Sequence, residues 1–156
     1  SQEIEHPGVI YLHDLIDSPK QIFFITDYIK GISLREYVKS YLIARLESSQ
    51  LVEFQQVVEA TFYLHTNVNV VHRDIKLDNI LLEEGTRMVK LIDFGFSVLV
   101  NDPRQRLKVF CGTPSYMAPE ITRKSDYEGL PVDMWALGVL LYVMLTGAFP
   151  FRGTSE

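Results

Sequence analysis

Cysteine is almost absent from the sequence, and Cys111 is the only one among 156 residues. A single thiol excludes an internal disulfide, and disulfide-free chains are typical of reducing compartments. We therefore expect an intracellular protein, cytoplasmic or nuclear. A basic stretch followed by an apolar run is also missing at the start, so we expect no signal peptide.

Positive charge is in deficit. Lysine and arginine total 15 against 20 aspartates and glutamates, and the formal net charge is −5. An acidic balance argues against a nucleic-acid groove and suits a protein that meets basic peptides. At 47% hydrophobic residues, the chain can form one globular domain with a core of its own.

Charge is absent altogether from residues 134–151, a run of eighteen residues. That length is compatible with a membrane span. The run contains Gly138, Gly147 and Pro150, however, and a helix that is apolar all round can equally be the buried axis of a soluble domain. We expect no membrane span.

Residues 72–95 carry the strongest functional signal. They read His-Arg-Asp-Ile-Lys-Leu-Asp-Asn, then two short apolar runs separated by a polar turn with Gly85, then Asp-Phe-Gly. This pattern predicts a β-hairpin. The outer ends of a hairpin meet, so Asn79 and Asp93 should lie side by side, and their oxygens are ligands that Mg²⁺ prefers. Asp74 should face the same metal, although each residue alone could be an ordinary turn residue.

Together these residues resemble the His-Arg-Asp and Asp-Phe-Gly signatures of a eukaryotic protein kinase domain. The triplet Ala118-Pro119-Glu120 resembles the end of the kinase activation segment. The resemblance implies an α+β, protein-kinase-like fold with a mostly helical large lobe and a remnant of the β-rich small lobe. Residues 1–29 would be the end of the small lobe and the hinge, and 30–156 the first part of the large lobe.

The resemblance also implies a role for each motif residue in ATP-dependent phosphoryl transfer. Asp74 would accept the proton of the substrate hydroxyl, and Lys76 would neutralise the γ-phosphate. Thr113 would bridge these two side chains. Asn79 and Asp93 would hold Mg²⁺.

The nucleotide base is expected between two further segments. Residues 6–16 and 21–29 are apolar and β-branched, which predicts two strands, although they could form a plain core hairpin. By resemblance, Thr26 is the gatekeeper of the adenine pocket, and Asp27, Tyr28 and Ile29 form the hinge. Leu81 would be the floor of the pocket.

Helices are predicted at 33–45, with Ser33 as N-cap, and at 47–66, with a short strand at 70–71. The apolar face of the second helix should contain Leu51, Phe54, Val57, Val58, Phe62 and Leu64. A further helix should start near Pro131. By resemblance, Asp133 in it accepts backbone N–H groups of the 72–79 loop; the alternative is an ordinary acid near a helix N-terminus. His72 and Phe94 should stack, with Leu12 above them.

The same resemblance suggests how substrates are chosen. Lys76 and Thr113 follow the serine/threonine pattern, and residues 111–120 resemble the calcium/calmodulin-dependent-kinase-like branch. Asp78 should face the peptide groove and favour a basic residue near the phosphoacceptor. Val143 stands where some basophilic kinases carry glutamate, which weakens that preference.

Regulation departs from the common pattern. Arg73 usually accompanies a phosphorylated activation loop. Here Val109 takes the place of the phosphothreonine, and residues 98–112 contain no Ser, Thr or Tyr. We expect no phosphate switch at this place, with Asp102 as a weaker partner for Arg73; an upstream kinase would have to modify Ser97 or Thr113 instead.

The 156 residues contain no Gly-rich loop, no nucleotide-binding strand lysine and no helix glutamate to pair with it. Two functions therefore stay open: a serine/threonine kinase of which this is the catalytic centre, and a non-catalytic kinase-like interaction module. Phosphotransfer to small molecules is disfavoured by residues 112–120, which resemble a peptide site. As it stands, the chain should bind ATP poorly.

Overall fold

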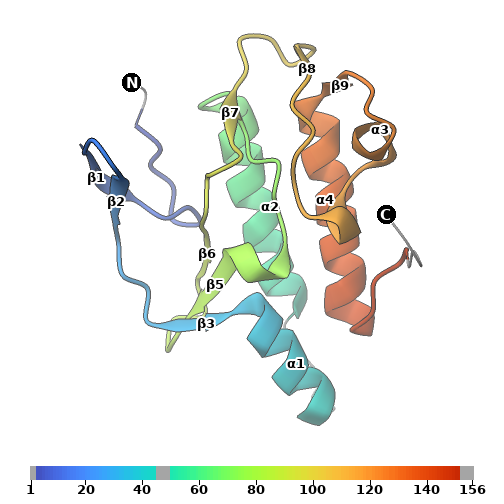
Figure 1. Ribbon diagram of the computed structural model, residues 1–156. Coiled ribbons are helices and arrows are strands. Elements are labelled where there is room, and N and C mark those ends of the chain that lie inside the picture. Colours follow the sequence, from blue (N-terminus) through green and yellow to red (C-terminus); the bar gives the residue numbers. More distant parts are fainter. Residues whose placement is uncertain (1–2, 45–49, 152–156) are drawn as a thin grey trace.

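The computed structural model describes residues 3–44 and 50–151. Two long helices, α2 (Gln50–Thr66) and α4 (Gly129–Thr146), lie side by side through the middle of the molecule (Figure 1). Small sheets flank them, and the described strands form one three-stranded and three two-stranded sheets. The expected α+β class is confirmed.

The main core lies where α2 and α4 meet each other and the sheet beside α2. Ala60 and Leu64 of α2 and Leu140 of α4 have no exposed surface. By length and composition alone, α4 is a candidate membrane span, but half of its residues are buried within this fold. Its apolar character is explained by that packing, as expected for a core helix.

The α4 helix begins at Gly129, two residues before the predicted start, and ends at Gly147. Gly147 has φ +71°, and its N–H donates to the carbonyl of Val143. A glycine in the left-handed region is a common helix stop because it has no Cβ to clash. The earlier start places Asp133 in the second turn of α4 and not in the first.

The predicted hairpin is confirmed as β5 (Ile80–Glu83) and β6 (Val89–Leu91), with Ile80 opposite Leu91. Its turn uses left-handed backbone at Gly85 and Arg87. A short 3₁₀ helix, η1 (Leu77–Asn79), leads directly into β5. A third strand, β3 (Gly31–Ser33), pairs with the other edge of β5 and was not predicted.

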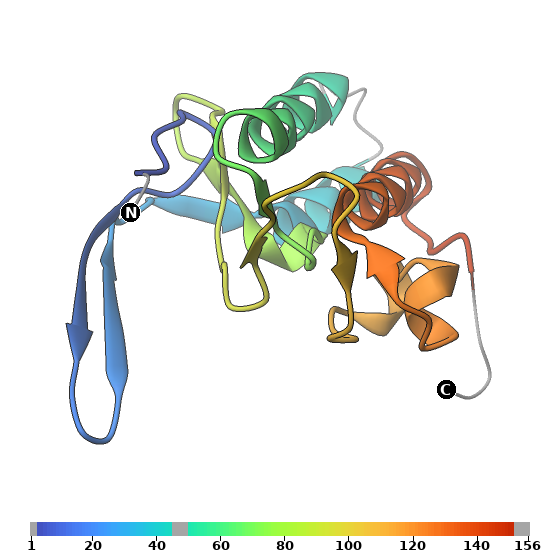
Figure 2. The same ribbon diagram turned by 90° about the horizontal axis from the view of Figure 1, so that it is seen from above.

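The first hairpin is shorter than predicted. It consists of β1 (Leu12–Asp17) and β2 (Ile22–Thr26), joined by a turn in which Ser18 and Gln21 bond each other. Residues 6–11 instead run beside β6, where Ile10 donates to the carbonyl of Leu91. Every residue of β1 and β2 is exposed, and the hairpin projects from the body (Figure 2).

Helix α1 (Leu34–Ala44) begins as predicted. The Ser33 hydroxyl accepts the N–H of Glu36 at 3.2 Å, which is the geometry of an N-cap. Residue 45, the predicted last residue, lies outside the described residues, as do residues 47–49 of the next predicted helix.

The predicted apolar face of α2 is only partly right. Val57 and Leu64 are buried, whereas Leu51 and Phe62 are 63% and 66% exposed. Glu53 has no exposed surface, because its carboxylate pairs with Arg87 across the core edge. A buried, paired charge breaks the simple apolar periodicity on which the prediction relied.

The remaining elements are short and support the loops. The predicted strand β4 (Val70–Val71) pairs with β7 (Val98–Leu99), and β8 (Arg106–Leu107) pairs with β9 (Tyr127–Glu128). Another 3₁₀ helix, η2 (Pro114–Tyr116), precedes α3 (Pro119–Thr122). A second apolar cluster around Val71, Leu107 and Tyr127 joins these elements to α4.

Two glycines make a matched test of this packing. A Cβ on Gly31 would lie 2.0 Å from the backbone oxygen of Leu82, whereas one on Gly138 meets nothing within 4 Å. We expect Gly31→Ala to lower the free energy of unfolding by about 3 kcal/mol, because β3 cannot stay at that distance. Gly138→Ala, inside α4, should raise it by about 0.5–1 kcal/mol. Urea unfolding of both variants measures this, and equal effects would contradict the β3–β5 pairing.

Candidate active site

The loop between β4 and η1 is held by a side chain from α4. The Asp133 carboxylate accepts the N–H of His72 at 2.9 Å and that of Arg73 at 2.8 Å. Asp133 is 1% exposed, and Arg73 has φ +66°. Because Asp133 lies in the second turn of α4, its place is explained by these bonds and not by the helix N-terminus.

His65 is a third partner of Asp133 that sequence reasoning missed. Its Nε2 lies 2.8 Å from Asp133 Oδ2, and the two residues are 68 positions apart. A buried carboxylate needs such partners, because leaving one unpaired is costly. His65 sits near the end of α2 in no motif, so only the packing of α2 on α4 identifies its role.

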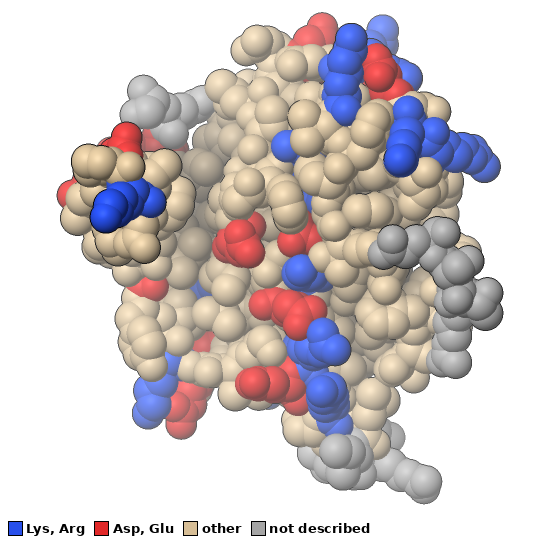
Figure 3. Space-filling view, viewed as in Figure 1, with Lys and Arg blue, Asp and Glu red and all other residues tan. Residues whose placement is uncertain are grey.

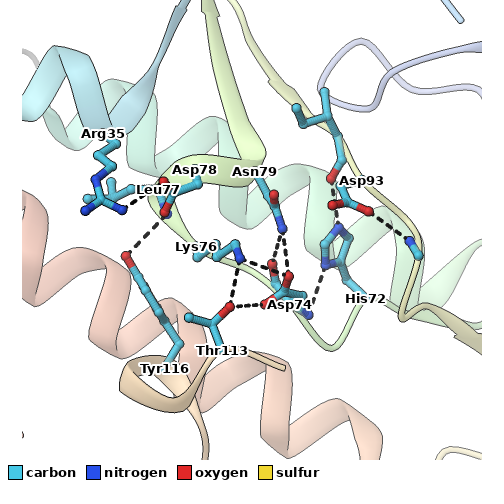
Figure 4. A network of polar contacts seen from close by, with 12 residues as sticks. Arg35, His72, Asp74, Lys76, Leu77, Asp78, Asn79, Asp93, Thr113 and Tyr116 are labelled. Carbon is cyan, nitrogen blue, oxygen red and sulfur yellow. Dashed lines mark hydrogen bonds and ion pairs between the residues drawn. The ribbon is translucent and has the colours of Figure 1, made fainter. Parts of the chain in front are cut away.

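Asp74, Lys76 and Thr113 form one polar cluster (Figure 4). The Thr113 hydroxyl donates to Asp74 Oδ1 at 2.7 Å and accepts from Lys76 Nζ at 2.8 Å. Lys76 Nζ also lies 3.3 Å from Asp74 Oδ2. The hydroxyl therefore sits between the carboxylate and the ammonium group, in the arrangement expected for these three residues.

Asn79 adds an amide to the cluster. Its Nδ2 donates to both the carbonyl and Oδ2 of Asp74, at 2.9 and 3.0 Å. This fixes the orientation of the Asn79 side chain, and its amide oxygen is left as the atom that could bind a cation. Both Asp74 and Asn79 are 6% exposed.

Asp93 lies at the other open end of the hairpin, as expected. The N–H of Ile92 donates to the carbonyl of Asn79, and Figure 4 shows the side chains of Asn79 and Asp93 at neighbouring strand ends. Asp93 has φ +58°, and its Oδ1 accepts the N–H of Gly95. Among the described residues no group of three His, Cys, Asp or Glu could hold a metal, so a cation here would have two protein ligands.

His72 and Phe94 make the expected ring contact, with centroids 4.9 Å apart at 67°. His72 Nε2 bonds the carbonyl of Ile92, and its Nδ1 accepts the N–H of Asp74. This pattern requires a neutral ring, and burial lowers the pKa of His72. Leu12, expected above the rings, lies on the projecting hairpin and lines the same cleft as Phe94.

That cleft has a volume of about 880 Å³ and runs between the first hairpin and the β5–β6 hairpin. The expected adenine residues all line it, and so does Asp93: Thr26, Asp27, Tyr28, Ile29 and Leu81. The structure therefore brings the hinge residues and one metal-ligand candidate into one space. Asp74 and Thr113 line a separate, water-sized cavity of about 10 Å³ behind the loop.

All 156 residues match the protein kinase domain family. This chain is a member of that family. It is 40% identical over 152 residues to sperm motility kinase 3A of Mus musculus and 39% identical over 156 residues to CBL-interacting protein kinase 25 of Oryza sativa subsp. japonica. It is 37% identical over 153 residues to the serine/threonine-protein kinase SIK3 homolog of Danio rerio.

These matches cover 97%, 96% and 97% of the chain but only 29%, 30% and 12% of the relatives. The chain therefore spans less than a third of the length of each. The predicted protein-kinase-like fold is confirmed. The family implies protein substrates, and ATP and Mg²⁺ are its general requirements.

In this kinase domain, Arg73 of the catalytic loop holds the activation segment without a phosphate. Its Nε donates to the carbonyl of Phe96 at 2.6 Å, and its Nη1 donates to the Val109 carbonyl and the Tyr127 hydroxyl. Tyr127 in turn donates to the Val109 carbonyl at 2.6 Å. Burial raises the pKa of Tyr127, which keeps the hydroxyl protonated as a donor.

The prediction that Asp102 partners Arg73 is wrong. The Asp102 carboxylate accepts the N–H of Arg104, which closes a local turn. Within residues 3–44 and 50–151, Arg73 forms no ion pair; its printed partners are two carbonyls and a hydroxyl. Short-range turn bonding holds the aspartate where it is, because Asp side chains readily bond the backbone two residues on.

The two substrate-side predictions also have definite positions. Asp78 is exposed on η1, and its Oδ1 lies 2.9 Å from Arg35 Nη1. Val143, which stands where some basophilic kinases carry glutamate, is buried in the α4 core. The structure thus places an arginine from α1 on the acid that was expected to face the peptide.

The neutral His72 ring predicts a pH dependence. In the unfolded chain the pKa of histidine is near 6.5, and in the folded chain that of His72 is lower. Below about pH 6.5 the unfolded chain binds a proton that the folded chain refuses, so the free energy of unfolding should fall as pH falls, by up to about 1.4 kcal/mol per unit. Urea unfolding between pH 7.5 and about 5 measures this.

His72→Tyr should reduce this slope, because the ring contact with Phe94 can persist without a titrating group. Phe94→Leu is the matched control: it loosens the same contact but keeps His72, so it should lower stability and retain the slope. An unchanged slope in His72→Tyr would contradict the assignment of the proton to this ring.

Proposed function

We propose that this chain is the catalytic centre of an ATP-dependent serine/threonine protein kinase, which transfers the γ-phosphate of ATP to a protein hydroxyl. The observation that carries the proposal is the Thr113 hydroxyl bridging Asp74 Oδ1 and Lys76 Nζ. It links the activation segment to the catalytic loop at the two side chains that would act on the substrate oxygen and the phosphate.

Asp74 is proposed as the group that orients the substrate hydroxyl and accepts its proton. Its two carboxylate oxygens are fixed by Thr113, Asn79 and Lys76, so the carboxylate cannot rotate freely. Phosphoryl transfer depends mainly on such positioning and on charge neutralisation. Lys76, bound to the same carboxylate, is proposed to face the γ-phosphate.

The donor set fits a magnesium nucleotide. Mg²⁺ prefers oxygen ligands and usually takes one or two from the protein and the rest from phosphates and water. The amide oxygen of Asn79 and the carboxylate of Asp93 would hold it, and when bound it would neutralise the phosphate charge. The hinge backbone at Asp27 and Ile29 would bond the adenine edge, with Thr26 and Leu81 beside it in the cleft.

Two observations support transfer to serine or threonine. The Lys76–Thr113 contact is the serine/threonine pattern, and relatives named serine/threonine-protein kinase are among the similar proteins. Residues 1–29 would then be the end of the small lobe and the hinge, and 30–156 the first part of the large lobe. The calcium/calmodulin-dependent-kinase-like branch and an intracellular location, cytoplasmic or nuclear, belong to the same proposal.

The activation segment is proposed to be ordered without phosphate between residues 98 and 112. Arg73 and Tyr127 already satisfy each other and the Val109 carbonyl. The bonds that a phosphothreonine would offer Arg73 are thus replaced by a buried tyrosine and two carbonyls.

The alternative, a non-catalytic kinase-like module, rests on the absence of a Gly-rich loop and strand lysine from the 156 residues. The nucleotide cleft is accordingly bounded on one side by a fully exposed hairpin. On either reading, these 156 residues alone should bind ATP weakly and associate through the exposed apolar strands.

The test uses the full-length protein expressed from its gene, with radiolabelled ATP, Mg²⁺ and peptides that contain serine or threonine. We expect transfer that Asp74→Asn reduces by about a hundredfold or more, the usual range for loss of a general base. Asp126→Asn, an exposed carboxylate elsewhere, is the matched control and should transfer normally. Absence of transfer by the wild-type protein, or equal rates in wild type and Asp74→Asn, would favour the non-catalytic module.

A further inference from the structure

The ion pair between Arg35 and Asp78 joins two rigid elements. Arg35 lies in the first turn of α1 and Asp78 in η1, 43 positions later, with 2.9 Å between Nη1 and Oδ1. Each residue follows a buried leucine: Leu34 has no exposed surface and Leu77 is 4% exposed. Because both backbones are fixed by their neighbours, the pair is formed with little freedom left to lose.

The pair lies next to the transfer site. Asp78 stands between Leu77, whose N–H reaches the Tyr116 hydroxyl of η2, and Asn79, which bonds Asp74. Figure 4 shows Arg35 and Asp78 on one side of Tyr116 and the Lys76–Thr113–Asp74 cluster on the other. A peptide whose hydroxyl reaches Asp74 must therefore pass close to Asp78.

The surface around the pair is electrically mixed. Acidic and basic side chains gather in one band over η1 and α1 (Figure 3). The side chains of Arg35 and Asp78 are 56% and 41% exposed, so a peptide can reach both. With Oδ1 bonded to Arg35, Asp78 cannot offer both oxygens to an incoming guanidinium, and bidentate pairing is what makes arginine binding to carboxylates strong.

We propose that Arg35 is a specificity-determining residue: it occupies the Asp78 subsite from within the chain, so the kinase accepts substrates with a neutral or acidic side chain there and does not select arginine. This rests on the proposed kinase function. It reverses the expectation drawn from Asp78 alone, which favoured a basic substrate residue. Val143, buried and uncharged, supplies no second acid for such a residue.

The test compares kcat/KM of the full-length protein on serine peptides that carry Arg, Gln or Glu at each position around the acceptor. In the wild type, Arg and Gln peptides should differ by less than about threefold at every position. Arg35→Gln should raise the Arg/Gln ratio by about three- to fivefold at one or two positions, the range of a partly exposed ion pair. Arg35→Lys, which keeps the charge, should stay closer to wild type.

Two controls separate the pair from general charge effects. Lys39→Gln removes an exposed cation one turn further along α1 and should leave the ratio unchanged. In Asp78→Asn, Arg35→Gln should produce no gain, because the carboxylate that arginine would bind is gone. Peptide-dependent gains in that double variant would overturn the assignment to Asp78.

A wild-type preference for Arg peptides above about tenfold would overturn the proposal, as would an unchanged ratio in Arg35→Gln with turnover intact. Loss of all transfer, with wild type and Asp74→Asn equally inactive, is a different result: it removes the kinase function itself and the subsite with it.

Discussion

A single buried carboxylate, that of Asp133, connects the largest helix to the loop that carries the chemistry. Burying a carboxylate costs free energy unless it is paired and hydrogen-bonded. Asp133 is 1% exposed and bonds two consecutive backbone N–H groups and the ring of His65. Because α4 is itself fixed by the core, these bonds transmit its position to the loop.

The groups next to this tie depend on it in turn. The loop turns back at Arg73, whose φ of +66° is a conformation that non-glycine residues rarely adopt. Such strain costs about 1–3 kcal/mol and persists only where surrounding contacts determine it. The Asp133 bonds on the backbone side and the Phe96, Val109 and Tyr127 bonds on the side-chain side supply those contacts. One residue thereby joins the helix, the catalytic loop and the activation segment.

Local pattern and motif spacing were enough to predict what depends on neighbouring residues. The β5–β6 hairpin, the meeting of Asn79 with Asp93 at its open end, and the Ser33 N-cap each depend on residues close in sequence. The Thr113 bridge was accessible only through the family resemblance. Two-residue strands such as β7 and β8 are too short to show a period, so they were missed.

Contacts between distant residues could not be read from one sequence. His65 with Asp133, Arg35 with Asp78 and Arg73 with Tyr127 are separated by 68, 43 and 54 positions. The same limit explains the wrong partner given to Arg73: Asp102 is near in sequence but is consumed by its own turn. The charge on Asp78 was likewise read without the arginine that covers it.

Hydrogen exchange at the His72 and Arg73 amides tests the central claim most directly. In the wild-type chain both should exchange slowly, and Asp133→Asn should speed exchange about ten- to a hundredfold, because an amide cannot replace a charged acceptor of two N–H groups. The Gly147 amide, bonded to Val143 at the far end of α4, should keep its rate. Unchanged exchange at His72 and Arg73 in Asp133→Asn would show that something other than this carboxylate holds the loop.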